Sequence, residues 1–224
     1  MILLFGGSFD PVHLGHLDLA RRALARYRPQ KLYLIPTKKN PLKDFAPGAN
    51  AFDRLHMAEL TAHELGSSET EVADWEIRRE GTSYTWDTVQ VVKHLNKDPD
   101  ITLVLGDEVF QTFPHWHRCQ ELVKEVNIVV CSRQTPLSKL QIERTLTQCG
   151  IRDGHWEHSA HPGEARYSHT HSRRWIETMT FEAIPVSGSE IREILTTYRG
   201  SVRPPGLSDS VWDYIKKSNL YSVK

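Results

Sequence analysis

Short apolar runs alternate along the chain with longer segments in which apolar residues recur every three or four positions. The apolar runs span residues 2–5, 31–35, 101–105, 127–131 and 181–186. Runs of this length between polar turns are typical of strands that are buried on both faces of a parallel sheet. The segments with helical periodicity span residues 14–27, 51–65, 85–95, 121–125 and 137–149. The alternation predicts an α/β fold with a Rossmann-like, doubly wound parallel sheet.

Three further segments complete this prediction. Residues 71–78 alternate enough to predict a peripheral strand, and residues 208–218 have the pattern of a closing helix. Residues 150–174 are polar and rich in histidine and glycine, which predicts a surface insertion before the last strand. A chain of 224 residues fits a single domain, 1–224, with a C-terminal helical segment near 188–218.

Charge and cysteine content narrow the classes of function. The chain has 28 basic and 28 acidic residues, so its balance gives no reason to expect a nucleic acid or a membrane surface as partner. No stretch approaches the roughly 18 apolar residues of a membrane span. Cys119, Cys131 and Cys149 are an odd number without a CxxC pair, which argues against disulfides and thiolate metal sites. We therefore expect a cytoplasmic protein.

The first predicted strand runs into the segment Gly-Gly-Ser-Phe-Asp-Pro-Val-His-Leu-Gly-His, residues 6–16. In a doubly wound sheet, ligands bind where a strand ends and the chain turns into a helix. Gly6 and Gly7 lack a Cβ, so a nucleotide can approach the backbone there, and Ser8 and Phe9 follow in the same turn. The amides at the start of the next helix attract phosphate. This segment therefore predicts an anion site.

Two histidines lie at the start of that helix. His13 and His16 are three residues apart, so we expect both imidazoles on one side of the first turn, facing one ligand. Two such donors can bind one polyphosphate. The alternative is that both are ordinary polar residues at a helix end.

A second phosphate motif precedes a late helix, in Pro-Val-Ser-Gly-Ser-Glu-Ile-Arg, residues 185–192. A serine followed three residues later by glutamate, here Ser187 and Glu190, is a capping box and predicts a helix start. The amides of Gly188 and Ser189, the serine hydroxyls and the guanidinium one turn further on suit a triphosphate. The alternative is a plain helix cap whose arginine is solvated.

Together the two motifs resemble the signatures of the HxGH nucleotidyltransferase superfamily, whose second motif is [ST]-x-[ST]-x-I-R. They are neither the GxGxxG motif of dehydrogenases nor a P-loop. The resemblance covers nearly the whole chain and is to the bacterial-type nicotinate mononucleotide adenylyltransferases. Its further segments are Ile35-Pro36, Pro41-Leu42-Lys43, Arg54-Leu55-His56-Met57, Ser83-Tyr84-Thr85, Leu105-Gly106-Asp107, Thr112-Phe113-Pro114-His115-Trp116 and Val129-Val130-Cys131-Ser132-Arg133.

The resemblance implies an enzyme that transfers AMP from ATP to nicotinate mononucleotide, and it implies three sets of site residues. The catalytic set is His13, His16 and Arg192. The ATP-binding set is Gly6, Gly7, Ser8, Phe9, Gly106, Asp107, Ser187, Gly188 and Ser189. The set that binds the acceptor mononucleotide is Lys43, Ser83, Tyr84, Thr85, Trp116 and Arg133.

Physical reasons accompany several of these roles. Asp107 follows a predicted central strand, where by resemblance a carboxylate binds ribose hydroxyls; the alternative is a simple turn. By resemblance Trp116 stacks on the pyridine ring, with a core tryptophan as the alternative. Residues 83–85 open a predicted helix, whose amides are all donors and favour a nicotinate carboxylate over a carboxamide. Lys43 and Arg133 resemble phosphate contacts, although such loop residues are often just solvated.

The acceptor loop departs from the family pattern at Leu42, where many relatives have a histidine, so the site is expected to depend more on Lys38, Lys39 and Lys43. The histidines of the insertion are His155, His158, His161, His169 and His171. Their spacing has no local metal-ligand geometry, which favours a solvated loop over a metal site.

By resemblance, Mg²⁺ is expected to arrive with ATP, held by phosphates and water, without a dedicated protein site. Two alternatives stay open. One is an enzyme that accepts nicotinamide mononucleotide or both acceptors, and the other is a nucleotide-binding module without catalysis. The sequence does not indicate an oligomeric state.

Overall fold

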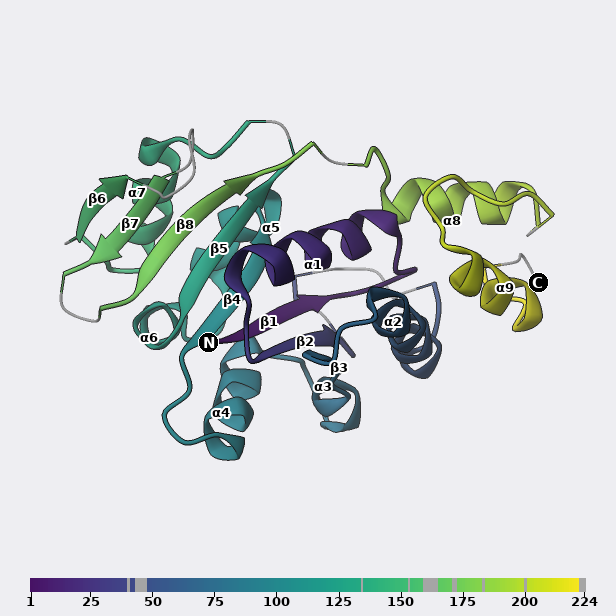
Figure 1. The fold of residues 1–224 in the computed structure, drawn as a ribbon, viewed down its shortest axis with the longest axis horizontal. Helices are drawn as coiled ribbons and strands as arrows, with labels where there is room; N and C mark the ends of the chain where they lie inside the picture. Colours follow the sequence, from purple (N-terminus) through teal and green to yellow (C-terminus); the bar gives the residue numbers. More distant parts are fainter. Residues whose placement is uncertain are drawn as a thin grey trace. The chain divides into compact units, whose positions relative to one another are not determined.

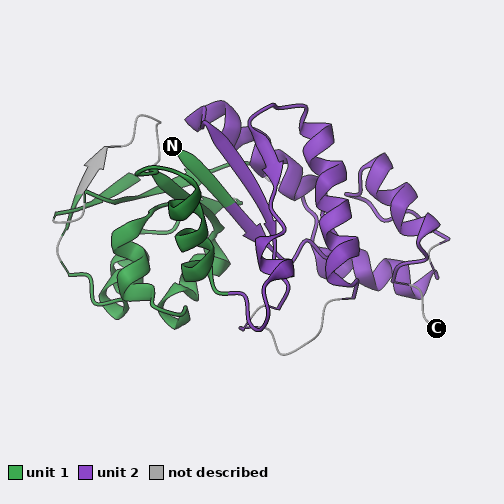
Figure 2. Cartoon of the chain, turned by 90° about the horizontal axis from the view of Figure 1, so that it is seen from below, with its two compact units in different colours: residues 1–4, 84–182 green, residues 5–83, 183–224 purple. Residues whose placement is uncertain are grey.

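The computed structural model describes residues 1–39, 41–42, 48–133, 135–152, 154–158, 165–170, 173–182, 184–199 and 201–221. Its strands and helices alternate along the chain (Figure 1). The chain forms two compact units, which Figure 2 shows in different colours. Unit 1 combines residues 1–4 with 84–182, and unit 2 combines residues 5–83 with 183–224. That the chain acts as one domain stays a prediction.

Unit 2 contains both nucleotide motifs, residues 6–16 and 185–192. Its elements are the end of β1 (Ile2–Gly7), α1 (Leu14–Tyr27), β2 (Lys31–Pro36), α2 (Ala51–Leu65), β3 (Thr70–Val72), α3 (Trp75–Arg78), α8 (Gly188–Thr197) and α9 (Asp209–Lys217). β2 pairs with β3 in parallel, and α2 packs against both strands and against α9. The described bounds of α1 and α2 are those that the hydrophobic periodicity predicts.

Unit 1 holds the start of β1 and the remaining strands. Its other strands are β4 (Ile101–Gly106), β5 (Asn127–Ser132), β6 (Gly154–His158), β7 (Ala165–His169) and β8 (Trp175–Thr180). Its helices are α4 (Thr85–Leu95), α5 (Asp107–Gln111), the 3₁₀ turn η1 (Phe113–His115), α6 (Cys119–Glu125) and α7 (Lys139–Gln148). β4 pairs in parallel with β1 and with β5, and β5 pairs in parallel with β8. Every residue of β5 is buried.

The strand order in the sheet is β3-β2-β1-β4-β5-β8-β7-β6. The strands that follow β1 along the chain lie first on one side of it and then, from β4 on, on the other. Such a reversal defines a doubly wound sheet, and ligands of this architecture bind at the carboxyl ends of strands beside it. The predicted α/β class is therefore confirmed.

The last parallel strand is not where the sequence predicts it. Residues 181–186 are the predicted position of that strand, but the strand is β8, and the described residues between it and α8 are irregular. The hydrophobic pattern does not indicate β8, because this strand contains the polar residues Glu177 and Thr178, which are nevertheless only 2% and 1% exposed. Arg166 on the neighbouring strand donates to the Glu177 carboxylate at 2.8 Å. This paired charge makes a buried strand resemble an exposed one.

The insertion also differs from its prediction. Residues 150–174 were expected to be a surface loop, but they contain β6 and β7, which pair antiparallel with each other, while β7 pairs antiparallel with β8. The sheet is therefore mixed and not purely parallel. His155 and His169 lie in these two strands and His158 ends β6, so the prediction of a loop is wrong for these three residues, although His155 is exposed to solvent as predicted. His161 and His171 lie outside the described residues.

Residues 71–78 were predicted as one strand, and they form the end of β3 followed by α3. The helical turn of α3 buries Glu76 and Ile77, and it places the Trp75 ring 4.9 Å from the ring of Tyr33 on β2. Contact with the neighbouring strand therefore overrides the alternating pattern. The helices that the sequence predicts match their predicted bounds to within about two residues, which is the usual uncertainty of helix ends, whereas α5 and η1 have no counterpart among the predicted helices.

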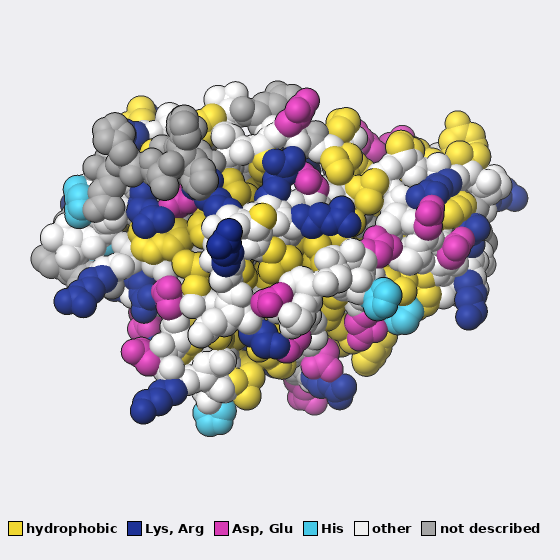
Figure 3. Space-filling model, viewed as in Figure 1, with side chains coloured by type: hydrophobic (Ala, Val, Ile, Leu, Met, Phe, Trp, Pro, Cys, Tyr) yellow, Lys and Arg dark blue, Asp and Glu magenta, His cyan; other side chains and the backbone are white. Residues whose placement is uncertain are grey.

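The surface in Figure 3 fits the balanced charge of the sequence, because basic and acidic side chains are interspersed over the face shown. Within the described residues, no helix is both long enough and apolar enough to span a membrane.

Candidate nucleotide-binding site

The loop after β1 is shaped by one buried aromatic ring. Phe9 is 1% exposed and has a backbone φ of 47°, in the left-handed region that side chains rarely adopt. A Cβ on Gly7 would lie 3.1 Å from the Phe9 ring, so a larger residue here would press against that ring. Gly6 is exposed, and a Cβ there would have no neighbour closer than 4.0 Å. The backbone that a ligand can approach is therefore at Gly6.

The two histidines of the HxGH motif lie side by side, as their spacing predicts. Their ring centroids are 3.8 Å apart, and the edge of the Phe9 ring lies beside His16, with centroids 5.1 Å apart. His13 is the N-cap of α1, and its backbone amide donates to Nδ1 of His16 at 3.2 Å. Since Nδ1 accepts, a neutral His16 carries its ring proton on Nε2. His16 can therefore donate a hydrogen bond from Nε2 to an oxygen.

Gly15 completes this turn. A Cβ at this position would lie 3.1 Å from two atoms of the His13 ring and 3.3 Å from Val186. The glycine of the motif therefore leaves room for an imidazole that is 8% exposed.

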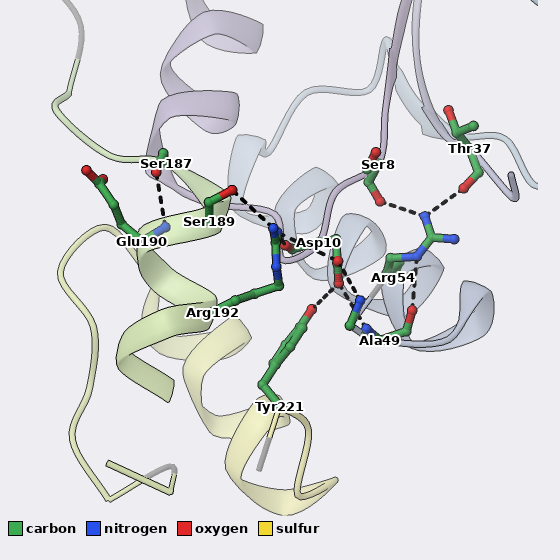
Figure 4. Close-up of polar contacts among 11 residues, drawn as sticks. Ser8, Asp10, Thr37, Ala49, Arg54, Ser187, Ser189, Glu190, Arg192 and Tyr221 are labelled. Carbon is green, nitrogen blue, oxygen red and sulfur yellow. Dashed lines mark hydrogen bonds and ion pairs between the residues drawn. The ribbon is translucent and has the colours of Figure 1, made fainter. Parts of the chain in front are cut away.

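The second motif begins α8 as the sequence predicts. The Ser187 hydroxyl accepts a hydrogen bond from the Glu190 amide at 3.1 Å. Arg192 donates from Nη2 to the Ser189 hydroxyl at 3.1 Å, and from Nη1 to the backbone carbonyl of Asp10 at 2.5 Å (Figure 4). A Cβ on Gly188 would lie 3.2 Å from the same carbonyl. The fold thus brings the two motifs, which are far apart in the sequence, into direct contact.

Asp10 is a residue whose role the sequence left unassigned, although it lies inside the first motif. Its carboxylate is buried and accepts from the amides of Gly48 and Ala49 at 2.8 and 3.0 Å, and from the Tyr221 hydroxyl at 2.8 Å. Arg192 lies 3.7 Å from the same carboxylate. The sequence gives no signal for this role, because the residues that contact the Asp10 carboxylate lie far from it along the chain.

Arg54 is a second such residue. It is 1% exposed and donates to the carbonyls of Ser8 at 2.6 Å, Thr37 at 2.7 Å and Ala49 at 3.3 Å (Figure 4). Burial lowers the pKa of its guanidinium, and the nearby Asp10 carboxylate acts in the opposite direction. Its bonds join the loop after β1 to both ends of the segment between β2 and α2.

The segment between β2 and α2 contains three lysines that are candidates for binding the acceptor mononucleotide, Lys38, Lys39 and Lys43. Of these, Lys43 lies outside the described residues. Ser83 is buried; its hydroxyl accepts from the Lys38 amide at 3.2 Å, and its own amide donates to the Lys39 carbonyl at 3.2 Å. Ser83 therefore supports the segment, and its amide is not available to a substrate carboxylate. The Lys38 ammonium donates to the Arg79 carbonyl at 2.8 Å.

Two other acceptor candidates open α4 in unit 1. Tyr84 is the N-cap, with its ring 4.5 Å from that of His117, and Thr85 is the first helical residue. Trp116 is half-buried, with its ring 5.2 Å from Phe113 and its Nε1 donating to the Thr112 hydroxyl at 3.2 Å. The indole is thus held in place without being enclosed in the core.

The remaining candidates of unit 1 lie just beyond two strands. Gly106 ends β4, and Asp107 begins α5, with its carboxylate accepting from the Glu108 amide at 2.8 Å. Arg133 directly follows β5 and is exposed. Among the described residues, no three His, Cys, Asp or Glu side chains are grouped so that they could hold a metal ion.

Comparisons with known proteins agree with this geometry. The sequence model of the cytidylyltransferase-like family matches residues 4–194. A probable nicotinate-nucleotide adenylyltransferase of Chlorobium phaeobacteroides is 32% identical over 222 residues, which cover 98% of each protein. A protein of the same name from Chloroherpeton thalassium is 37% identical over 147 residues, which cover 65% of this chain and 73% of that protein.

Among solved structures, the nicotinic acid mononucleotide adenylyltransferase of Plasmodium falciparum, complexed with NaAD, matches with a TM-score of 0.69. The match covers 98% of this chain and 96% of that one at 18% identity, so it shows a shared fold. The family match, in contrast, spans both nucleotide motifs. The chain therefore belongs to the cytidylyltransferase-like family, among relatives that are named nicotinate-nucleotide adenylyltransferases.

Proposed function

We propose that this protein is a nicotinate-nucleotide adenylyltransferase, which transfers AMP from ATP to nicotinate mononucleotide and releases pyrophosphate. The observation that carries the proposal is the contact between the two motifs. Arg192 of the second motif donates to the backbone carbonyl of Asp10 in the first motif, which also carries the paired imidazoles of His13 and His16. A relative of that name, matched over 98% of both proteins, supports the choice of reaction.

The reaction is an in-line displacement. An oxygen of the acceptor's 5′-phosphate forms a bond to the α-phosphorus of ATP, while the bond from that phosphorus to the bridging oxygen of pyrophosphate breaks. No protein group forms a covalent bond, so catalysis consists of positioning the two phosphates and stabilising the charge that develops between them.

His16, His13 and Arg192 supply that stabilisation in this proposal. His16 donates from Nε2 to a phosphoryl oxygen, because its Nδ1 already accepts from the His13 amide. Arg192 has five N–H donors, of which the bonds to Asp10 and Ser189 use two. The remaining donors suit the oxygens of a triphosphate.

Mg²⁺ enters this proposal as part of the ATP complex. When bound, it neutralises phosphate charge. Asp10 is the buried carboxylate of the first motif, and it already accepts hydrogen bonds from the Gly48 and Ala49 amides and the Tyr221 hydroxyl. These donors leave it poorly suited to be a metal ligand, which supports an ion held by phosphates and water.

A cytoplasmic location is also part of the proposal. All three cysteines are buried and free, as in proteins of reducing compartments. The partners are ATP and nicotinate mononucleotide.

The test measures pyrophosphate release from ATP with nicotinate mononucleotide or nicotinamide mononucleotide as acceptor. The amides at the start of α4 can donate to a carboxylate but cannot accept from a carboxamide NH₂. We therefore expect kcat/KM for nicotinate mononucleotide to exceed that for the amide by about 10² to 10⁴. Comparable values would favour a dual-specificity enzyme. Binding of ATP without release of pyrophosphate from it in the presence of either acceptor would favour a non-catalytic module.

A further inference from the structure

Tyr221, the last residue that the structure describes, contacts the loop that follows β1. Tyr221 donates from its hydroxyl to Oδ1 of Asp10 at 2.8 Å, across 211 sequence positions. Its backbone carbonyl accepts from the Thr196 hydroxyl of α8 at 3.3 Å. Tyr221 is therefore attached both to the first nucleotide motif, through the bond to Asp10 that Figure 4 shows, and to the helix that carries Arg192.

The Asp10 carboxylate accepts hydrogen bonds from several donors. Oδ1 accepts from the Tyr221 hydroxyl and the Ala49 amide, and Oδ2 accepts from the Gly48 amide. Nη1 of Arg192 is 3.7 Å from Oδ2, which is longer than a hydrogen bond, and donates to the Asp10 carbonyl instead. The hydroxyl thus occupies a position on the carboxylate that a guanidinium could otherwise take in a two-bond pair.

The Tyr221 ring is held in place by close packing. A Cβ on Gly48 would lie 2.9 Å from the ring and 3.1 Å from Cδ of Arg192, so the ring and the arginine side chain both lie against this glycine. Burial, with the Asp10 charge as a second cause, raises the pKa of Tyr221 above its ordinary value. The hydroxyl therefore stays a donor throughout the neutral range.

We propose that Tyr221 is a positioning residue for the nucleotide site: its hydroxyl holds the Asp10 carboxylate away from a direct pairing with Arg192, which leaves the guanidinium available to the phosphates of ATP. This inference rests on the proposed function, in which Arg192 binds the triphosphate. Without the hydroxyl, the carboxylate regains an unoccupied acceptor position, and Arg192 is the nearest cation that can fill it.

The first test is Tyr221→Phe, which keeps the ring against Gly48 and removes only the hydroxyl. Because Arg192 would be drawn to the carboxylate, we expect the KM for ATP to rise about tenfold, as when a hydrogen bond to a charged group is lost. The KM for the acceptor should change less than about twofold. In an Arg192→Lys background, which lacks the planar fork, Tyr221→Phe should add little, and this double-mutant cycle measures the coupling.

Tyr214→Phe is the matched control. Its hydroxyl also donates to a carboxylate, that of Asp53, at 2.7 Å, but this bond is outside the network of Asp10. We expect its ATP kinetics to equal those of the wild type, while both variants lose similar stability. If Tyr221→Phe fails to fold, Thr196→Val provides the second variant, because it removes the hydrogen bond that holds the Tyr221 backbone to α8 and should also raise the KM for ATP.

Calorimetric titration with ATP alone separates this inference from the proposed function. If neither mononucleotide accepts AMP, the proposed function fails, and the affinity of wild type and variants for ATP still tests the role of Tyr221. Equal ATP affinity in the wild type and Tyr221→Phe, or an equal loss for ATP and acceptor, would overturn the inference.

Discussion

His16 has its two ring nitrogens in different roles. Nδ1 accepts from the His13 amide, so in the neutral ring the proton lies on Nε2, which is then the ring's donor. If the ring were doubly protonated, its Nδ1–H would meet the N–H of His13, and the bond that orients the ring would be lost. The neutral tautomer is therefore the one that the backbone of the motif selects.

His16→Ala is expected to lower kcat by about 100-fold or more, since it removes a donor to the transition state. The KM of the acceptor should change far less. His16→Gln keeps a donor near the position of Nε2, whereas the shorter side chain of His16→Asn places its amide near Nδ1 and leaves no donor at the Nε2 position, so the glutamine variant should retain more turnover. Steady-state kinetics of the three folded variants decide the matter, and normal turnover in the alanine variant would place His16 outside the site.

At the scale of elements, the start of α4 is the feature that bears on acceptor choice. The first amides of a helix have no partner within it, and here the helix begins at Thr85 after Tyr84. Tyr84 has φ −104° and ψ 131°, the extended conformation that a following proline requires. A proline is also well tolerated at the first helical position. Thr85→Pro can therefore remove one amide donor without disturbing the helix.

We predict that Thr85→Pro lowers kcat/KM for nicotinate mononucleotide about tenfold, because it deletes a donor to a charged carboxylate. The value for nicotinamide mononucleotide should change by less than about twofold. Lys139→Pro, at the equivalent exposed position of α7 after the extended Ser138, is the control for proline insertion. A parallel loss for both acceptors in Thr85→Pro would refute the role of this helix start.

At the scale of the whole molecule, each unit buries a group that resists losing its proton. In unit 2, burial and the Asp10 carboxylate raise the pKa of Tyr221 above its ordinary 10.0. In unit 1, burial and then the neighbouring Cys119 raise the pKa of Cys149 above its ordinary 9.0. An unfolded chain releases both protons at those ordinary values while the folded chain keeps them. The stability due to the neutral groups is thus complete below the ordinary values and is lost as pH rises above them.

Urea unfolding should therefore show a stability that is constant near pH 8 and falls above pH 9 to 10, by up to about 1.4 kcal/mol per pH unit for each group. Cys149→Ala should remove the part of the decrease that starts lower, and Tyr221→Phe the part that starts higher. Tyr198→Phe, at an exposed tyrosine, is the control. An identical pH profile in all four proteins would contradict the prediction.

The sequence by itself determined the features that depend on neighbours along the chain. The bounds of α1, α2 and α4 follow from hydrophobic periodicity, and the start of α8 follows from the cap that Ser187 forms with the Glu190 amide. The side-by-side imidazoles of His13 and His16 follow from the geometry of one helical turn. In each case the interacting groups are only a few residues apart, so the pattern of residues contains the contact.

Only the tertiary structure decided where polar groups are buried, because their partners are remote in sequence. The sequence suggests that Glu177 is exposed, but Arg166 on the adjacent strand pairs with it and allows it to be buried. The last parallel strand therefore contains Glu177 and ends before the residues that were predicted to form it. Asp10 likewise meets Tyr221 across 211 positions, and no local pattern marks either partner. Burying a charge is costly unless a specific donor satisfies it, and that donor is known only when the chain has folded.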